Sequence, residues 1–193
     1  MDEGAPAYEG FAISWLQMPR PLMVSPGLGI LNPSMSTEAP KPTAESLPHV
    51  QPHLGGCRWE GVTVMPYKED GTHFKSISRQ LLYPGGHDLP VELRCFQMQA
   101  DGYSTLERHH HAHLVMIVQG RGHVMVGGEI REIGMLDVVH IPPMTWHQFR
   151  ADLGEPMSFA CIVNAQRDKP QRPGPEDIAA LNEDPAVKDY IRY

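Results

Sequence analysis

Residues 106–126 read LERHHHAHLVMIVQGRGHVMV, and this stretch decides the fold. Short runs with apolar residues at alternate positions stand on both sides of Gln119-Gly120-Arg121, which is typical of two strands joined by a turn. Four of the chain's 11 histidines fall between His109 and His113. The stretch therefore predicts a β-rich domain in which histidines gather at one place.

Similar short runs, broken by Gly, Pro and Asp, continue on both sides of this stretch. The predicted strands are 61–64, 75–82, 91–99, 104–109, 113–118, 122–126, 136–141, 147–151 and 158–164. Strands this short at this spacing predict an all-β barrel or sandwich.

The flanking sequence differs in composition from this β region. Residues 1–56 contain nine of the 19 prolines, so we expect a Pro-rich arm that is extended or disordered. Residues 57–167 form the expected barrel domain. Residues 168–193 carry Pro175 and Pro185 with acidic neighbours, which are helix-start signals, and predict one or two short helices.

The charge, the hydrophobic pattern and the cysteine content exclude several classes of protein. The chain has 193 residues, with 16 Lys and Arg against 23 Asp and Glu, a net charge of -7 that argues against nucleic acid as a partner. The apolar run at 11–16 is too short to span a membrane. Cys57, Cys95 and Cys161 are widely spaced and indicate neither a disulfide framework nor a thiolate zinc site. A cytoplasmic protein with a small-molecule partner fits these observations best.

The histidine segment is a candidate metal site. If 106–115 is a strand, Glu107, His109, His111 and His113 share one face, because side chains alternate. His147 is available from a later strand. Imidazole with carboxylate suits iron, manganese, nickel, copper or zinc. The alternative is a His-rich surface strand that binds metal adventitiously.

These residues resemble the two motifs of the cupin superfamily, which lie on strands of a double-stranded β-helical jelly-roll barrel. With Gly120 as the last glycine of the first motif, the motif's HxH pair falls on Glu107 and His109 and its glutamate falls on His113. Pro142 and His147 fit the second motif. The resemblance covers residues 91–164.

Departures from the family pattern affect both turns and ligands. Asp101, Leu136 and Met144 stand where the family usually has glycine, and Ala151 replaces its final asparagine. The usual His-His-Glu-His order becomes Glu107, His109, His113 and His147, which keeps three imidazoles and one carboxylate. The resemblance therefore implies one divalent transition metal, with iron as the first choice, on these four ligands.

Such a site leaves coordination positions for a substrate or dioxygen. The resemblance implies a metal-dependent enzyme that acts on a small organic molecule, such as a mononuclear iron dioxygenase, or else an isomerase or lyase. A ligand-binding or sensing cupin without turnover is the alternative, and a purely structural metal is a third reading. Residues expected around the site are His111, Val115, Ile117, Trp146, Phe149 and Arg94. Because exposed sheet edges attract partners, we also expect a homodimer.

Overall fold

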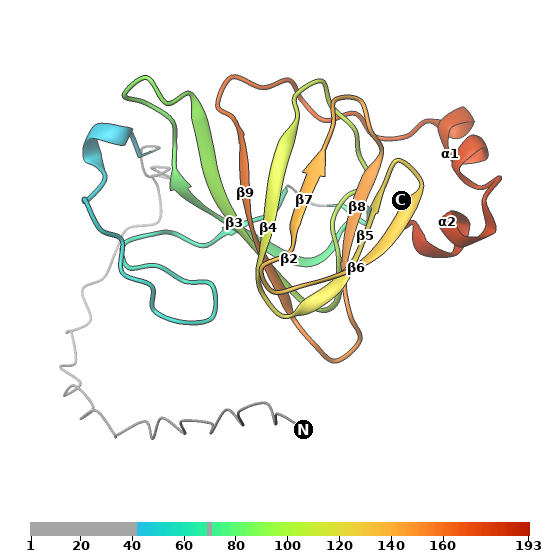
Figure 1. The fold of residues 1–193 in the computed structure, drawn as a ribbon, viewed down its shortest axis with the longest axis horizontal. Coiled ribbons are helices and arrows are strands. Elements are labelled where there is room, and N and C mark those ends of the chain that lie inside the picture. Colours follow the sequence, from blue (N-terminus) through green and yellow to red (C-terminus); the bar gives the residue numbers. More distant parts are fainter. Residues whose placement is uncertain (1–41, 69–70) are drawn as a thin grey trace, which may run out of the picture. The chain divides into compact units, whose positions relative to one another are not determined.

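The computed structural model describes residues 42–68 and 71–193 (Figure 1). Most of the predicted N-terminal arm, residues 1–41, lies outside the described residues. The strands are β1 (Met65–Pro66), β2 (Lys75–Tyr83), β3 (Val91–Tyr103), β4 (His113–Gln119), β5 (Arg121–Val126), β6 (Glu129–Gly134), β7 (Val138–Ile141), β8 (His147–Ala151) and β9 (Met157–Asn164). The helices are a 3-10 turn (Ala44–Ser46), α1 (Pro175–Leu181) and α2 (Pro185–Tyr190).

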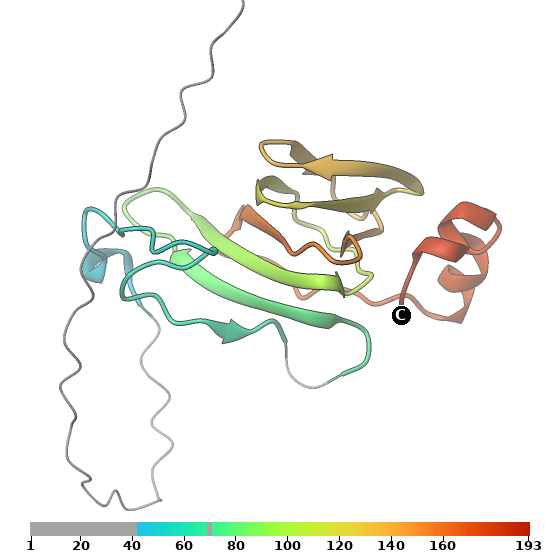
Figure 2. The ribbon, with the colours of Figure 1, turned by 90° about the horizontal axis from the view of Figure 1, so that it is seen from below.

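The strands form one curled antiparallel sheet (Figures 1 and 2). Its order is β6-β5-β8-β3-β9-β4-β7, with β2 added to β3 and β1 to β2. The predicted all-β fold with short C-terminal helices is confirmed. No helix within the described residues is long and apolar enough to cross a membrane.

Alternation along the strands builds the interior of the curled sheet. In β4, Val115 and Ile117 are 1% and 0% exposed. Three stacked rings fill the core, since Phe159 lies 5.1 Å from Phe96 and 4.8 Å from Phe149 between ring centroids. Burial of each such apolar side chain contributes about 1.5–3 kcal/mol to folding.

The C-terminal helices pack on a second apolar cluster outside the sheet interior. Proline opens each helix, and the Asp184 carboxylate accepts a 2.8 Å hydrogen bond from the backbone N–H of Ala186. The Tyr190 hydroxyl contacts the carbonyl oxygens of His123 at 2.8 Å and Gln148 at 3.1 Å. These contacts attach α2 to β5 and β8.

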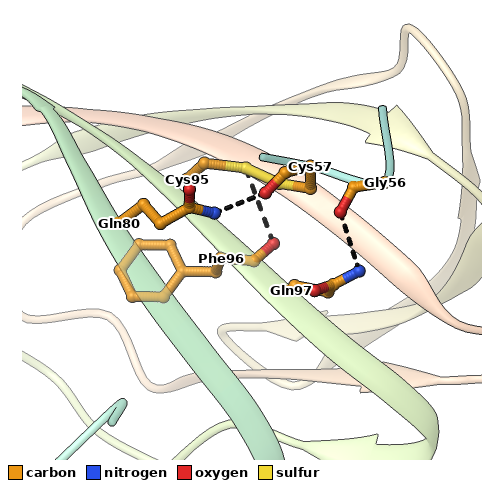
Figure 3. Close-up of a disulfide and its surroundings, with 6 residues drawn as sticks. All are labelled: Gly56, Cys57, Gln80, Cys95, Phe96 and Gln97. Atoms are coloured by element: carbon orange, nitrogen blue, oxygen red, sulfur yellow. Dashed lines mark hydrogen bonds between the residues drawn. A yellow bond between two sulfur atoms is a disulfide. The ribbon is translucent and has the colours of Figure 1, made fainter. Parts of the chain in front are cut away.

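Residues 51–66, here called the strap, are held against β2 and β3. The Gln80 side-chain amide donates to the Cys57 carbonyl, and the Gln97 amide donates to the Gly56 carbonyl at 3.0 Å (Figure 3). A disulfide joins Cys57 of the strap to Cys95 of β3. The sequence-based expectation of no disulfide is therefore wrong, because 38 residues separate two cysteines that only the docked strap brings together. The cytoplasmic location stays a prediction.

Three strand predictions differ from the structure. In place of the strand expected at 61–64, a turn ends at Gly61 and residues 62–64 are irregular, and the short strand β1 follows them. Residues 104–109 form only isolated bridges, in which Glu107 pairs with His147 and Arg108 with Gln171. Strand β6 was not predicted, because its charged residues hide the alternation; it pairs with β5 after a turn in which Gly127 and Gly128 have positive φ.

Candidate metal centre

Three histidines converge at the end of the sheet. His109 lies in the bridged segment after β3, while His113 begins β4 and His147 begins β8. One ring nitrogen from each lies within 4.8 Å of the others. His109 and His147 are buried, and His113 is half-buried. Within the described residues this group is the one whose donor atoms meet at metal-binding distances.

The orientation of each ring is fixed through its Nδ1 atom. His109 Nδ1 donates to the His111 carbonyl at 2.6 Å, and His147 Nδ1 donates to the Thr145 carbonyl at 2.9 Å. Because a carbonyl oxygen only accepts, both rings carry the proton on Nδ1 and keep a free Nε2 lone pair. His113 Nδ1 lies 3.2 Å from the Sγ of Cys161, and its buried Nε2 has no hydrogen-bond partner. Three Nε2 atoms are thus available to a metal.

The site keeps these imidazoles neutral. Burial lowers the pKa of His109 to about 4 and that of His113 to about 2, with the neighbouring His147 as the next cause in both. Burial also lowers the pKa of His147. Neutral imidazole is the form that binds metal, so the donor set fits a divalent transition metal at neutral pH.

Glu107 lies beside the histidines, but its carboxylate is engaged elsewhere. Its backbone exchanges two hydrogen bonds with His147, of 3.2 and 3.0 Å. Its side chain is paired with Lys68, which also donates to the Thr105 hydroxyl at 3.0 Å. The structure therefore brings three of the four predicted ligands together, and a ligand role for Glu107 stays a prediction.

His111 flanks the group of three histidines, and its predicted role beside the site stays a prediction. Its ring stacks on that of His109, with centroids 3.7 Å apart and planes 7° from parallel. Its Nδ1 lies 2.7 Å from a carboxylate oxygen of Asp168, which also accepts the backbone N–H groups of His110 and His111. These hydrogen bonds, with that from His110 first, lower the pKa of Asp168. No sequence signal marked Asp168, because it follows β9 in a segment that reads as a linker.

Arg94 and Cys161 lie next to His113 and contact each other. The Arg94 guanidinium donates to Cys161 Sγ at 3.4 Å and lies 5.2 Å from the centre of the Phe96 ring. Burial raises the pKa of the Cys161 thiol, and Arg94 acts in the opposite direction. Arg94 was predicted near the site, whereas Cys161 was not assigned to it from the sequence.

The remaining predicted residues lie in apolar packing. Val115, Ile117 and Phe149 belong to the sheet interior. Trp146 packs instead against the cluster under the C-terminal helices, with Arg108 4.4 Å above its ring.

Comparisons with known proteins agree with this architecture. A family model described as a cupin domain matches residues 95–163. The chain is 48% identical over 142 residues to a 1-methylthio-D-xylulose 5-phosphate methylsulfurylase of Rhodospirillum rubrum, covering 73% of this chain and 90% of that protein.

Two solved structures are also similar. A cupin 2 conserved barrel domain protein from Rhodopseudomonas palustris matches with a TM-score of 0.71 and 47% sequence identity. The match covers 75% of this chain and 99% of that protein's chain. A cupin-2 domain from Rhodospirillum rubrum matches with a TM-score of 0.67 and 48% sequence identity. The match covers 73% of this chain and 95% of that domain's chain.

Proposed function

The chain belongs to the cupin family, and on that basis we propose that it is a metal-dependent enzyme that removes the methylthio group from a small keto-sugar phosphate. The observation that carries this proposal is the group of His109, His113 and His147, whose neutral rings leave three Nε2 atoms for one ion. The substrate class comes from the name of the Rhodospirillum rubrum relative.

The chemistry of such a substrate suits this site. In a 1-methylthio-xylulose phosphate, the carbon that carries sulfur is next to the ketone carbon. A divalent metal on the three histidines would supply a Lewis acid for the ketone oxygen. Replacement of the C–S bond by a C–H bond is a reduction, so we include an external thiol: its sulfur takes the methylthio group as a mixed disulfide, and the carbon takes a proton.

The chain also offers cations for the phosphate group. The charges of Arg172 and Lys68 both lower the pKa of His73, after burial, while Glu107 raises it. Arg172 and Lys68 therefore both lie within electrostatic range of His73, and Lys68 is paired with Glu107 beside the histidine group. We assign the phosphate to Arg172 and Lys68, because a phosphate oxygen accepts from basic side chains at short range.

Two alternatives from the sequence remain testable beside this proposal. An iron dioxygenase would use the same histidines and consume dioxygen. A ligand-binding or sensing cupin would bind the sugar phosphate without forming product. The relative's name favours cleavage of the C–S bond over both.

The test uses the full chain loaded separately with manganese, iron, nickel, copper or zinc. Each sample receives 1-methylthio-xylulose 5-phosphate and dithiothreitol, with product followed by mass spectrometry and dioxygen by an oxygen electrode. We expect metal-dependent formation of the 1-deoxy sugar phosphate, lost in His147→Ala and retained in His123→Ala, whose ring lies outside the group and contacts Asp152. Dioxygen consumption, or saturable binding without product, would overturn the proposal in favour of the first or the second alternative.

A further inference from the structure

Arg94 carries its charge into the interior of the curled sheet. It lies on β3 at the same parity as Phe96 and Met98, whose side chains belong to the apolar core. Its register partner on β9 is Cys161, which is also a core residue. The guanidinium accordingly contacts two interior groups: Nη2 lies 3.4 Å from Cys161 Sγ, and Cζ lies 5.2 Å from the centre of the Phe96 ring.

This interior cation has no carboxylate partner within the part of the chain that the structure describes. Its Nε atom is buried and has no hydrogen-bond partner, and Cys161 Sγ is only a weak acceptor. Glu92, the buried carboxylate at the same parity on β3, is paired with Arg167 at 2.8 Å. Charges inside a protein are normally paired, because an unpaired one is costly. The position of Arg94 therefore calls for a reason other than stability of the fold.

Arg94 also lies next to the group of three histidines. A single sulfur atom connects them, because Cys161 Sγ is 3.4 Å from the Arg94 guanidinium and 3.2 Å from His113 Nδ1. The charge of Arg94 is one of the causes, after burial and the neighbouring His147 and His109, that lower the pKa of His113. The field of the guanidinium therefore extends to the histidine group and attracts an anionic ligand there.

The proposed reaction creates negative charge on the substrate. As the thiol sulfur bonds to the sulfur of the methylthio group, the C–S bond breaks and its electron pair stays with the carbon. The adjacent ketone shares this pair, so negative charge builds on the ketone oxygen until the proton released by the thiol reaches the carbon. A donor that binds this oxygen more strongly as its charge grows lowers the barrier to the reaction.

We propose that Arg94 is a catalytic residue that donates to the ketone oxygen of the substrate while negative charge builds on that oxygen. This inference rests on the proposed function. A guanidinium suits the task, because its N–H groups only donate and its charge is permanent. The phosphate assigned to Arg172 and Lys68 is charged throughout the reaction, whereas the ketone oxygen becomes anionic only as the bond breaks. Removal of Arg94 should therefore lower kcat and leave KM nearly unchanged.

The first test compares the binding of two ligands to the zinc-loaded full chain by titration calorimetry. Phosphoglycolohydroxamate mimics the anionic form of a ketose phosphate, and xylulose 5-phosphate presents a neutral ketone. We expect Arg94→Met to bind the hydroxamate about 10–100-fold more weakly than the wild type does, and to bind xylulose 5-phosphate nearly as well. Arg94→Lys, which keeps the charge, should lose less. Arg131→Met is the control, because Arg131 pairs with Glu129 on the exposed surface.

Three binding results would overturn the proposal. They are a wild type that does not bind the hydroxamate, an Arg94→Met variant that binds it with wild-type affinity, and an Arg94→Met variant that loses affinity for both ligands equally. The last result would show that Arg94 supports the fold of the site and does not sense charge on the ligand.

Steady-state kinetics provides the second test. The kcat of Arg94→Met should fall roughly 100-fold, as is typical when one donor to a developing oxyanion is removed. A wild-type kcat in Arg94→Met would overturn the inference and leave the proposed reaction intact. Failure of the proposed reaction is recognised separately, because the wild type itself would then form no 1-deoxy sugar phosphate, and both proposals would fall.

Discussion

His113 Nδ1 lies 3.2 Å from Cys161 Sγ, so a sulfur atom on β9 anchors a histidine on the adjacent strand β4. The other two histidines of the group are held by backbone carbonyls, which any sequence provides. The anchor of His113 is therefore the one that a single substitution can remove.

We predict that Cys161→Ala weakens metal binding about 10–100-fold, which is typical for loss of a partner behind a metal ligand. Cys161→Ser should bind metal more tightly than the alanine variant, because its hydroxyl still offers a hydrogen bond. Competition with a chelator measures both. Ser158→Ala, also buried on β9, is the control. Equal affinity in Cys161→Ala and wild type would show that this contact does not support the site.

The metal-free protein should lose stability in acid. The pKa of His109 is about 4 in the folded protein and 6.5 in the unfolded chain, so the unfolded state binds more protons between these values. The free energy of unfolding should therefore be steady above pH 6.5 and fall by up to about 3 kcal/mol towards pH 4 from this group. Urea titrations across this range measure the effect, and His109→Gln should show a shallower decline. Stability that stays level on acidification would contradict the neutral imidazole.

Reduction of the Cys57–Cys95 disulfide should destabilise the domain. The bridge closes a loop of 38 residues, for which lost chain entropy corresponds to about 3–4 kcal/mol. Denaturant titrations with and without reductant should differ by this amount in wild type, and by little in Cys57→Ser. Alkylation of the unreduced, unfolded protein should label Cys161 alone. Labelling of all three cysteines would show that the bridge is absent in solution.

Removal of Arg172 should affect substrate binding more than turnover. Loss of one charge-assisted contact to a phosphate predicts about a tenfold rise in KM, with kcat nearly unchanged. Steady-state kinetics of Arg172→Ala measures this split. Arg121→Ala is the control, because Arg121 pairs with Glu155 on the exposed surface. A wild-type KM in Arg172→Ala would remove this residue from the proposed phosphate site.

The elements that were predicted most accurately from the sequence are those whose formation depends on a local pattern of residues. In β4, alternation identified both the strand and the buried positions Val115 and Ile117. Proline at the start of each C-terminal helix likewise located α1 and α2. Strand β6 was missed because its charges reflect an edge position, which depends on the whole sheet.

From the sequence, the histidines of the candidate site could be predicted, but their hydrogen-bond partners could not. The argument for the histidines was strand parity, which holds only in part. Strand parity placed His109 and His113 on one side, yet residues 104–109 form bridges and not a strand. The partners Lys68, Cys161 and Asp168 come from segments distant in sequence. Their contacts form only when the folded sheet brings these segments together, and no local pattern contains them.

Metal content is the most direct test of the central claim, that His109, His113 and His147 form a metal centre. Inductively coupled plasma mass spectrometry should be applied to tag-free protein purified without added metal, as wild type, His147→Ala and the His123→Ala control. We predict close to one equivalent of a divalent transition metal in the wild type and the control, and its loss in His147→Ala. Full occupancy in His147→Ala, or no uptake by the wild type after metal is added, would contradict the account.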